Sequence, residues 1–347
     1  MQQKLNIGGQ AVIEGIMMKS PNFVSVGVRK PDNKIVVKEI EYNPMGKKYK
    51  FLTWPFFRGV VMMFEMLVLG IKALNLSANE ALDEENDKQK KGKKKGNEEY
   101  KEEKKLDKKE MKDNKEEKED IKKENEEELS GFAIAITIFF SLVFAIALFV
   151  VVPYVLTTWI GIHEEKSSVL FNIIDGIIKL AFFILYVVAI GLIGDVKKVF
   201  QYHGAEHKAV NCYESGLKLN VKNCKKFSTV NARCGTSFLL FVILIGIVIF
   251  SFVPILVTSV WPNFLGLELV WRKAVLLVIR ILFLLPLAAL SYEFLKLTAR
   301  CYTNKIIKII TWPGLFVQKL TTREPSDDML EVAIKAIEDV LKKEKRV

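Results

Sequence analysis

The sequence predicts a mostly α-helical integral membrane protein, in which four transmembrane helices carry a cytoplasmic α+β cap with an N-terminal β-hairpin and an interfacial helix. Two observations support this fold class. Half of the 347 residues are hydrophobic and 26% are charged, and the two kinds occur in separate long runs. The tract 83–128 holds 16 Lys against 19 acidic residues, so the net charge of +11 comes from the segments around the apolar runs.

Residues 1–50 are expected to form a small cytoplasmic β-rich domain. The segments Phe23–Lys30 and Lys34–Tyr42 alternate apolar and polar residues, and the turn sequence Pro31–Asn33 separates them. This pattern predicts a β-hairpin.

Residues 51–80 predict an interfacial amphipathic helix. Arg58, Glu65 and Lys72 recur every seven residues and form one polar stripe opposite an apolar face. Glu65 interrupts the apolar stretch, so we do not count this helix as a span. Residues 81–129 are a charged low-complexity linker that cannot bury a core.

Four long apolar segments predict the spans: 131–160, 175–194, 236–258 and 271–293. Arg280 lies inside the last one, where a charge needs a partner or water. The segment between the second and third spans, 195–235, holds eight Lys and Arg, whereas the other two connections hold one and none. This bias predicts a multi-pass membrane protein with both termini cytoplasmic.

The remaining segment, 297–347, is predicted to be a cytoplasmic helical tail. It contains helix patterns over 304–320 and 327–343. The second begins after Ser326, with Asp327 in its first turn, and its apolar stripe must pack on another element.

The clearest chemical motif is H-x-x-E-H in the 195–235 segment. On a helix, His203 and His207 face the same way, so both imidazoles can bind one Zn²⁺ or another divalent metal. Glu206 beside them is a candidate catalytic general base. Against this stands the simpler interpretation that both histidines are solvated polar residues near a helix start.

A third ligand is less certain from spacing. Glu214 lies seven residues after His207 and is the nearest candidate on the same helix face, although a helix end follows closely. Cys234, beside Arg233 and before a span, is a candidate ligand or nucleophile, or a small residue in a tight turn. Glu14 is interpreted as the buried partner of a basic residue, with a ligand donated by the N-terminal domain as the alternative. The other cysteines are interpreted as structural or incidental: Cys212, Cys224 and Cys301.

At these segments the chain resembles DUF1385, a bacterial membrane family of unknown function labelled YqhQ-like and predicted to be metal-dependent. The matching segments run in order along the chain: Gly8–Met18, Arg58–Leu74, Tyr202–Glu214, Arg233–Phe238 and Pro313–Ile334. In the family pattern a histidine and a proline precede R-C-G-T-S, and this chain has Asn231 and Ala232 there. If that histidine is a ligand in relatives, this chain lacks it.

Two functions follow as expectations. The first is a metal-dependent membrane enzyme, a hydrolase acting on a membrane-proximal peptide or lipid headgroup. The alternative is a non-enzymatic scaffold or membrane-protein assembly factor, whose cap binds a membrane or cytosolic protein partner and whose His and Glu form a hydrogen-bond network. Transport is less favoured, because four spans show no inverted repeat. Membrane lipids are expected partners, and no motif predicts specific nucleic-acid binding.

Overall fold

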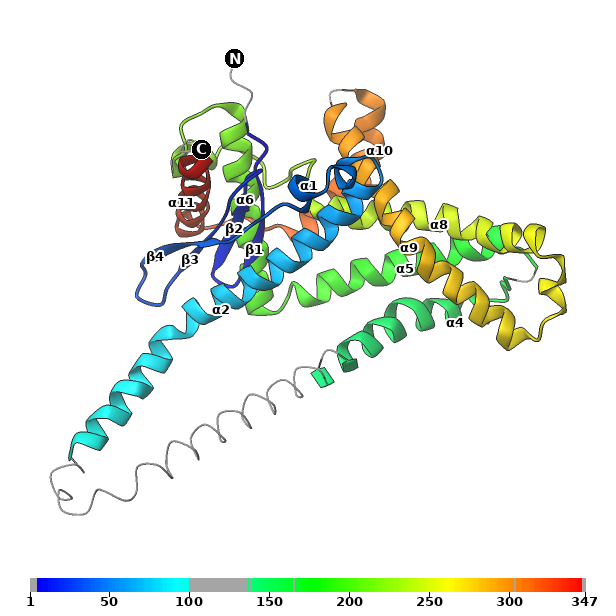
Figure 1. Cartoon of the computed structure of the whole chain (residues 1–347), viewed down its shortest axis with the longest axis horizontal. Coiled ribbons are helices and arrows are strands. Elements are labelled where there is room, and N and C mark those ends of the chain that lie inside the picture. The colour runs from blue at the N-terminus through cyan, green and yellow to red at the C-terminus, as the bar shows by residue number, and fades with distance from the viewer. Residues whose placement is uncertain (1–4, 100–135, 138, 165, 303, 345–347) are drawn as a thin grey trace. The chain divides into compact units, whose positions relative to one another are not determined.

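The computed structural model describes residues 5–99, 136–137, 139–164, 166–302 and 304–344 (Figure 1). The chain divides into two compact units, one of residues 1–81 with 157–347 and one of residues 82–156. The first unit holds a four-stranded sheet, a helical bundle and the H-x-x-E-H motif.

The sheet is an antiparallel meander of β1 (Gly8–Val12), β2 (Gly15–Lys19), β3 (Val24–Arg29) and β4 (Ile35–Ile40), in that order. The predicted hairpin is confirmed as β3 and β4, with Val24 opposite Ile40. The preceding hairpin, β1–β2, was not predicted, because its glycines resemble loop chemistry. It closes through a turn in which Glu14 takes a left-handed backbone, with φ of 47°.

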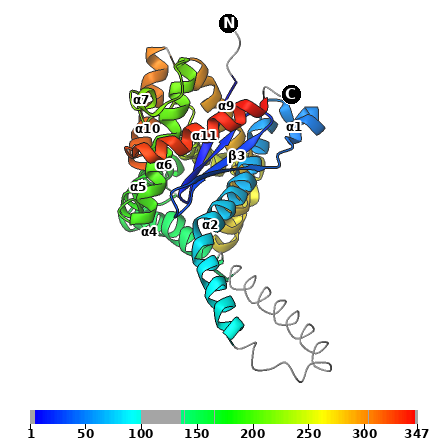
Figure 2. The same ribbon diagram turned by 90° about the vertical axis from the view of Figure 1, so that its left-hand side faces the viewer.

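Helices cover both faces of the sheet (Figure 2). Alternation along β2 sends Ile16 and Met18 toward α6 (Gly194–Ser215) and α11 (Asp327–Glu344), and Met17 toward the other face. On that other face, β3 presents valines to α2 (Phe57–Glu99), where Leu69 and Ala73 are buried. The cap, which we define as the sheet with α6, α7 (Val221–Cys224) and α11, is therefore built from both ends and the middle of the chain.

Two buried carboxylates fix α2 against the sheet. Glu65 accepts hydrogen bonds from the Tyr42 hydroxyl and the Met45 backbone N–H, each at 2.7 Å. Glu80 pairs with Lys30 at 2.8 Å and also with Lys38. The stretch of α2 between these two residues thus runs along the sheet. Before it lie the short helices α1 (Met45–Lys48) and η1 (Lys50–Thr53).

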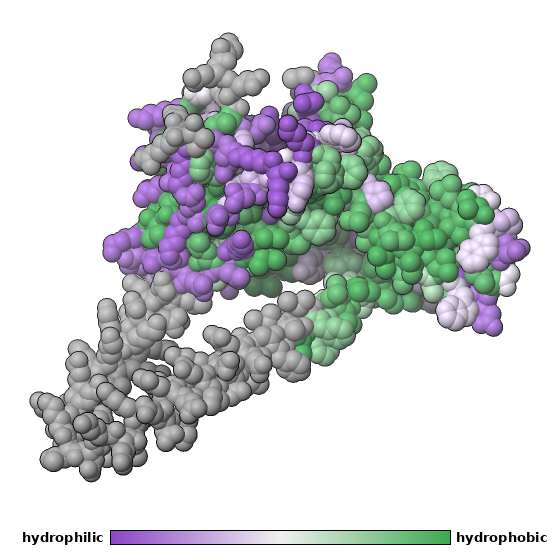
Figure 3. Space-filling view, viewed as in Figure 1, coloured by the Kyte–Doolittle hydropathy of each residue, from purple (hydrophilic) through white to green (hydrophobic). Residues whose placement is uncertain are grey.

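In the part of the chain that the structure describes, five helices are long and apolar enough to cross a membrane, one more than the sequence predicted. Those corresponding to the four predicted spans are Phe139–Trp159, α5 (Ser168–Ile190), α8 (Gly235–Val260) and α9 (Leu269–Arg300). The additional one is Phe57–Ala81 of α2, expected to be interfacial. These helices indicate a membrane protein. In Figure 3, hydrophobic residues cover the α8 and α9 end of the first unit and hydrophilic residues gather over the sheet.

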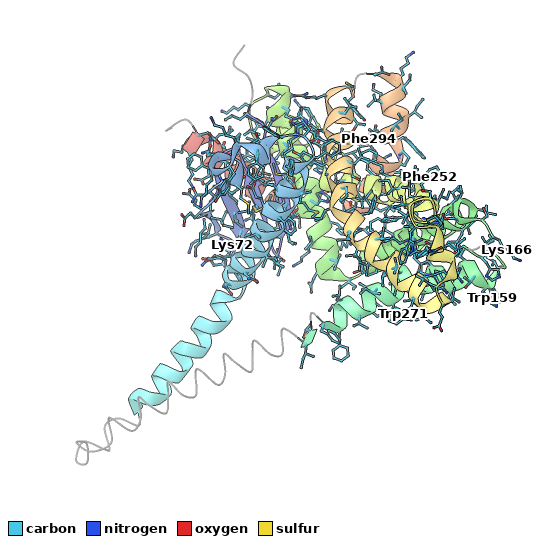
Figure 4. The ribbon with its side chains drawn as sticks, turned by 45° about the vertical axis from the view of Figure 1, so that its right-hand side comes forward. Lys72, Trp159, Lys166, Phe252, Trp271 and Phe294 are labelled. Carbon is cyan, nitrogen blue, oxygen red and sulfur yellow. The ribbon has the colours of Figure 1, made fainter. Side chains whose placement is uncertain are left out.

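The span boundaries differ in part from the prediction. Ser167 accepts a hydrogen bond from Leu170 N and starts α5 seven residues before position 175. α8 packs on both α5 and α9, and we call these three helices the bundle. Arg280 in α9 does have a partner, since its Nη2 donates to Glu164 at 2.6 Å. Figure 4 shows Trp159, Lys166 and Trp271 at the end of the bundle away from the sheet.

The second unit contains the rest of α2 and most of the helix Phe139–Trp159, which includes the π-helical turn η2 (Ala147–Val151) and α4 (Val152–Trp159). Of the predicted linker 81–129, residues 81–99 are helical, and the remainder lies outside the described residues.

The two predicted tail helices are confirmed within one residue at each end. They are α10 (Lys305–Thr321) and α11 (Asp327–Glu344). The stripe on α11 that needed a partner packs on α6 and on β2 and β3, where Leu330 and Ile337 are fully buried.

Candidate metal site

The helix α6 presents the H-x-x-E-H motif at the junction between the cap and the bundle. It begins after the bend at the end of α5 and ends at Gly216, which caps it with a left-handed backbone at φ 82°. Gly204, inside the motif, lies under the backbone of Arg323, in the segment joining α10 to α11. The motif is therefore covered by the segment 321–324.

Both motif histidines are oriented by backbone carbonyls. Nδ1 of His203 lies 3.0 Å from Thr321 O, and Nδ1 of His207 lies 2.5 Å from Thr229 O. A carbonyl oxygen only accepts, so each Nδ1 carries the proton. In the neutral rings each Nε2 then has a lone pair, which is the tautomer that a metal-binding histidine needs.

The two imidazoles lie close to each other and to a sulfur atom. His203 Nε2 lies 3.2 Å from Cys234 Sγ, and the two imidazole ring centroids are 4.5 Å apart. One ligand atom from each of His203, His207 and Cys234 lies within 4.8 Å of the other two. His207 Nε2 is buried and has no hydrogen-bond partner among the described residues. This buried, unsatisfied acceptor is the strongest sign that the site takes an additional atom.

Cys234 comes from a different part of the chain. It is the N-cap of α8, and its Sγ accepts from Thr236 N at 3.4 Å. The turn before it is held by Gln318 of α10, whose side-chain amide accepts from Asn231 N at 2.9 Å and donates to Asn231 O at 2.7 Å. Gln318 is fully buried. The role of Gln318 was not predicted from the sequence, although a glutamine on the face of α10 that becomes buried was a signal of a structural hydrogen bond.

Glu206 points toward the sheet and not into the cluster. Its carboxyl group packs against Gly9 of β1, where an added Cβ would lie 3.1 Å from Glu206 Cδ. Burial raises the pKa of Glu206, while the nearby His203 and a backbone hydrogen bond from Gly9 act in the opposite direction. Its Oε2 is buried and has no partner among the described residues.

Glu214 is not brought to the cluster. It forms an ion pair with Arg233 at 2.5 Å. Glu14 pairs with Lys198 at 2.6 Å, so the ion-pair interpretation agrees with the structure, but its side chain is 31% exposed and not buried.

Asn231, at the position where the family pattern has histidine, bonds back to the same helix. Its Nδ2 donates to Asn211 Oδ1 at 3.1 Å, and its Oδ1 accepts from Arg233 N at 2.8 Å. Asn211 in turn donates to the backbone oxygens of Ser228 and Val230, each at 3.1 Å. The face of α6 that carries the histidines thus binds the loop 228–234 along its length.

The remaining cysteines lie elsewhere. Cys212 and Cys224 are fully buried in the core of the cap, and Cys301 is exposed beyond α9. Burial and the adjacent Cys212 raise the pKa of the Cys224 thiol to about 12. None of the three belongs to the cluster.

The donor set of the cluster fits a divalent zinc ion. Zn²⁺ is bound by imidazole nitrogen and thiolate sulfur, and sites with three protein ligands leave a fourth position for water or substrate. The described residues supply two nitrogens and one sulfur, and the Nε2 of His207, one of the three residues, is buried without a hydrogen-bond partner among them. Asn231 is not required for this set.

Comparison with known proteins yields two matches. A family model described as "Protein of unknown function (DUF1385)" matches residues 54–343. The chain is also 30% identical over 358 residues to "Uncharacterized protein YqhQ" of Bacillus subtilis strain 168, covering 97% of this chain and 92% of that protein. No solved structure matches significantly.

Proposed function

The chain belongs to the DUF1385 family of unknown function, and we propose that it is an integral membrane protein with a Zn²⁺ site on the cytoplasmic face, where it acts as a hydrolase. One observation supports this proposal: ligand atoms of His203, His207 and Cys234 lie within 4.8 Å of one another, and Nε2 of His207 is buried without a partner among the described residues. Such an acceptor costs free energy unless a hydrogen-bond donor or a cation completes it.

Each residue of the site is given a separate role. His203, His207 and Cys234 would hold the ion, which supplies Lewis-acid activation when bound. Glu206 would be the general base, and because its carboxyl group faces Gly9 of β1, its side chain would have to turn toward the ion, or act through a water molecule, to accept a proton. The carbonyls of Thr321 and Thr229 keep the two imidazoles in the required tautomer.

The packing of the cap favours four spans over five. The sheet and α6 contact each other, so they lie on the same side of a bilayer. Within the described residues, three candidate spans separate them in sequence: Phe57–Ala81, Phe139–Trp159 and α5. Only an even number of crossings returns the chain to the same side. Because α2 runs along the sheet from Glu65 to Glu80, we infer that α2 is the one that does not cross.

The same count of membrane crossings indicates on which side of the bilayer the termini lie. Two crossings, α8 and α9, also separate α6 from α11, which pack together. Both termini therefore share the side of α6, and the eight basic residues of 195–235 favour the cytoplasmic side of the bacterial cell membrane. Because the site lies where the cap meets the helices, a membrane-proximal peptide or a lipid headgroup is the substrate class that it favours.

Metal analysis of the purified full-length chain tests the site. After incubation with Zn²⁺ and gel filtration, we expect about one equivalent in the wild type and background levels in His207→Asn and Cys234→Ser. His163→Ala is the matched control, since His163 is the third histidine of the chain and lies outside the cluster. Background zinc in the wild type, or equal zinc in all four proteins, would end the proposal.

Hydrolysis needs a separate test. Glu206→Gln should keep the zinc but lose cleavage of peptides or phospholipids. Cleavage is measured in reconstituted vesicles by mass spectrometry of the products. Cleavage by Glu206→Gln at the wild-type rate would remove the general-base assignment.

The scaffold alternative is supported by a different observation, the continuous hydrogen bonding of α6 to the loop 228–234. In that function His207 matters only for its bond to Thr229. Asparagine places its amide nitrogen where Nδ1 lies and offers no Nε2. His207→Asn would therefore preserve a scaffold and abolish a metal-dependent activity, while His207→Ala would impair both. Cellular complementation by the two variants separates the functions.

A further inference from the structure

The helix α10 has an apolar face that the described residues leave uncovered. One side of α10 packs on α8 and buries Thr311, Gly314 and Gln318. On the other side, Ile306 is 66% exposed, Ile309 73% and Trp312 65%. Isoleucines at 306, 309 and 310 and Phe316 follow helical spacing, so they form one continuous stripe.

Basic residues border this stripe. Lys305, Lys308 and Lys319 are exposed, and Lys308 lines an open recess together with Ile309 and Trp312. The described part of α10 carries no acidic residue. An apolar stripe with Trp, bordered by lysines whose stems can reach outward, is the composition of a helix lying in the headgroup layer of a membrane.

We propose that this face of α10 docks into the anionic phospholipids of the cytoplasmic leaflet. Two observations favour lipid over a protein partner. The helix follows α9 after a few residues, so it begins at the membrane surface. The lysines complement negatively charged headgroups, and tryptophan prefers the headgroup level. The inference rests on the proposed membrane location and goes beyond the proposed chemistry.

The docked helix also organises the metal site. On its inner face, Gln318 holds the turn before Cys234, and Thr321 O orients His203. A displacement of α10 at the membrane surface would shift a thiol ligand and an imidazole ligand together. Anionic lipid is therefore expected to tighten metal binding through α10.

Lipid quenching at Trp312 provides the test. The full-length chain is reconstituted in nanodiscs of phosphatidylcholine with a minor fraction of phosphatidylglycerol, and either lipid carries bromine on its acyl chains. The Trp312 signal is the fluorescence difference between the wild type and Trp312→Phe. We expect stronger quenching by the brominated anionic lipid, with its enrichment at Trp312 falling about fivefold for each lysine lost in Lys305→Gln and Lys308→Gln. Lys222→Gln, an exposed lysine of α7, is the matched control.

The possible outcomes of the quenching experiment either support or overturn the proposal. Absence of a Trp312 quenching signal, as expected if the helix Phe139–Trp159 covers this face, would overturn the proposal, and so would equal quenching by both lipids. The quenching needs no metal, so it can succeed even if the metal site fails. In the same nanodiscs, Co²⁺ titration should show weaker binding without phosphatidylglycerol. An unchanged Co²⁺ affinity would refute the coupling through α10.

Discussion

Gly204 and Arg323 are in direct backbone contact: a Cβ on Gly204 would overlap the carbonyl oxygen of Arg323. Arg323 is held there by its N–H, which donates to Phe200 O at 2.9 Å, and by its guanidinium, which donates to Gly191 O at 3.1 Å. The glycine of the motif, which weakens a helix in isolation, therefore lets the segment 321–324 cross α6 and reach His203.

Gly204→Ala should lower the unfolding free energy by about 1–3 kcal/mol, since the overlap forces the crossing segment outward. It should also weaken zinc binding, because Thr321 O moves with that segment. Thermal unfolding in detergent and metal analysis measure the two effects. Gly194→Ala, in the same helix with open space around it, is the control and should be close to neutral. Equal effects of both substitutions would contradict the steric account.

Gln318→Ala is expected to reduce metal affinity about 10–100-fold, the usual effect of removing a group that orients a ligand. The paired hydrogen bonds to Asn231 are lost, and the turn before Cys234 loosens. Co²⁺ titration gives the affinity, and the sulfur-to-cobalt absorption band reports Cys234 specifically. In detergent without anionic lipid, Lys319→Ala changes the neighbouring exposed residue and should leave both readouts unchanged. An intact band with unaltered affinity in Gln318→Ala would remove this role.

The cap should lose stability in acid partly through Asp339 of α11. Burial raises the pKa of Asp339, but hydrogen bonds from Lys343 at 2.7 Å and Ser25 at 2.6 Å outweigh it, so the folded pKa lies below the ordinary value. A lowered folded pKa means that this stabilisation is complete above the unfolded pKa, near 4, and is lost as pH falls through the folded value.

Asp339→Asn should therefore be less stable than the wild type at pH 7, with the difference shrinking below pH 4. Unfolding midpoints measured across pH in detergent give the comparison. Glu338→Gln, at an exposed position on the same helix, should follow the wild-type profile. A constant offset between Asp339→Asn and wild type at every pH would show that packing, and not ionisation, accounts for the effect.

The topology predicts which positions a membrane-impermeant maleimide reaches in intact cells. In a Cys301→Ser background, Asp32→Cys, Asn79→Cys and Lys222→Cys should react only after lysis, because the proposed topology puts all three on the cytoplasmic side. Lys166→Cys, between the helix Phe139–Trp159 and α5, should react in intact cells. Labelling of Asn79→Cys from outside would mean that α2 crosses the bilayer and that the count above is wrong.

The local pattern of apolar and polar residues was sufficient to predict the elements with strong periodicity. The hairpin β3–β4, both tail helices and the apolar spans follow from alternation or long apolar runs. The i, i+4 spacing likewise brings His203 and His207 together, since a helix dictates it. In contrast, α2 has enough apolar residues to be counted as a span, and only its packing on the sheet argues for an interfacial position.

The third ligand could not be chosen from spacing. Glu214 is on the same helix, but Arg233 lies closer to it than the histidines do and takes its carboxylate. Cys234 joins the cluster through tertiary contacts: Gln318 of α10 holds its turn and the crossing segment covers His203. Such long-range contacts leave almost no trace in a single sequence.

The division of the cap among distant segments has a consequence for biosynthesis. The sheet leaves the ribosome first, α6 follows after the first membrane crossings, and α11, which completes the core on that face of the sheet, is made last. Until then the residues of β2 and α6 that α11 covers lack the apolar face of α11. A chain that stalls before residue 327, or inserts one helix too few, cannot close this core and would leave it open to proteolysis. The cap can therefore close only after residues 327–344 have been synthesised.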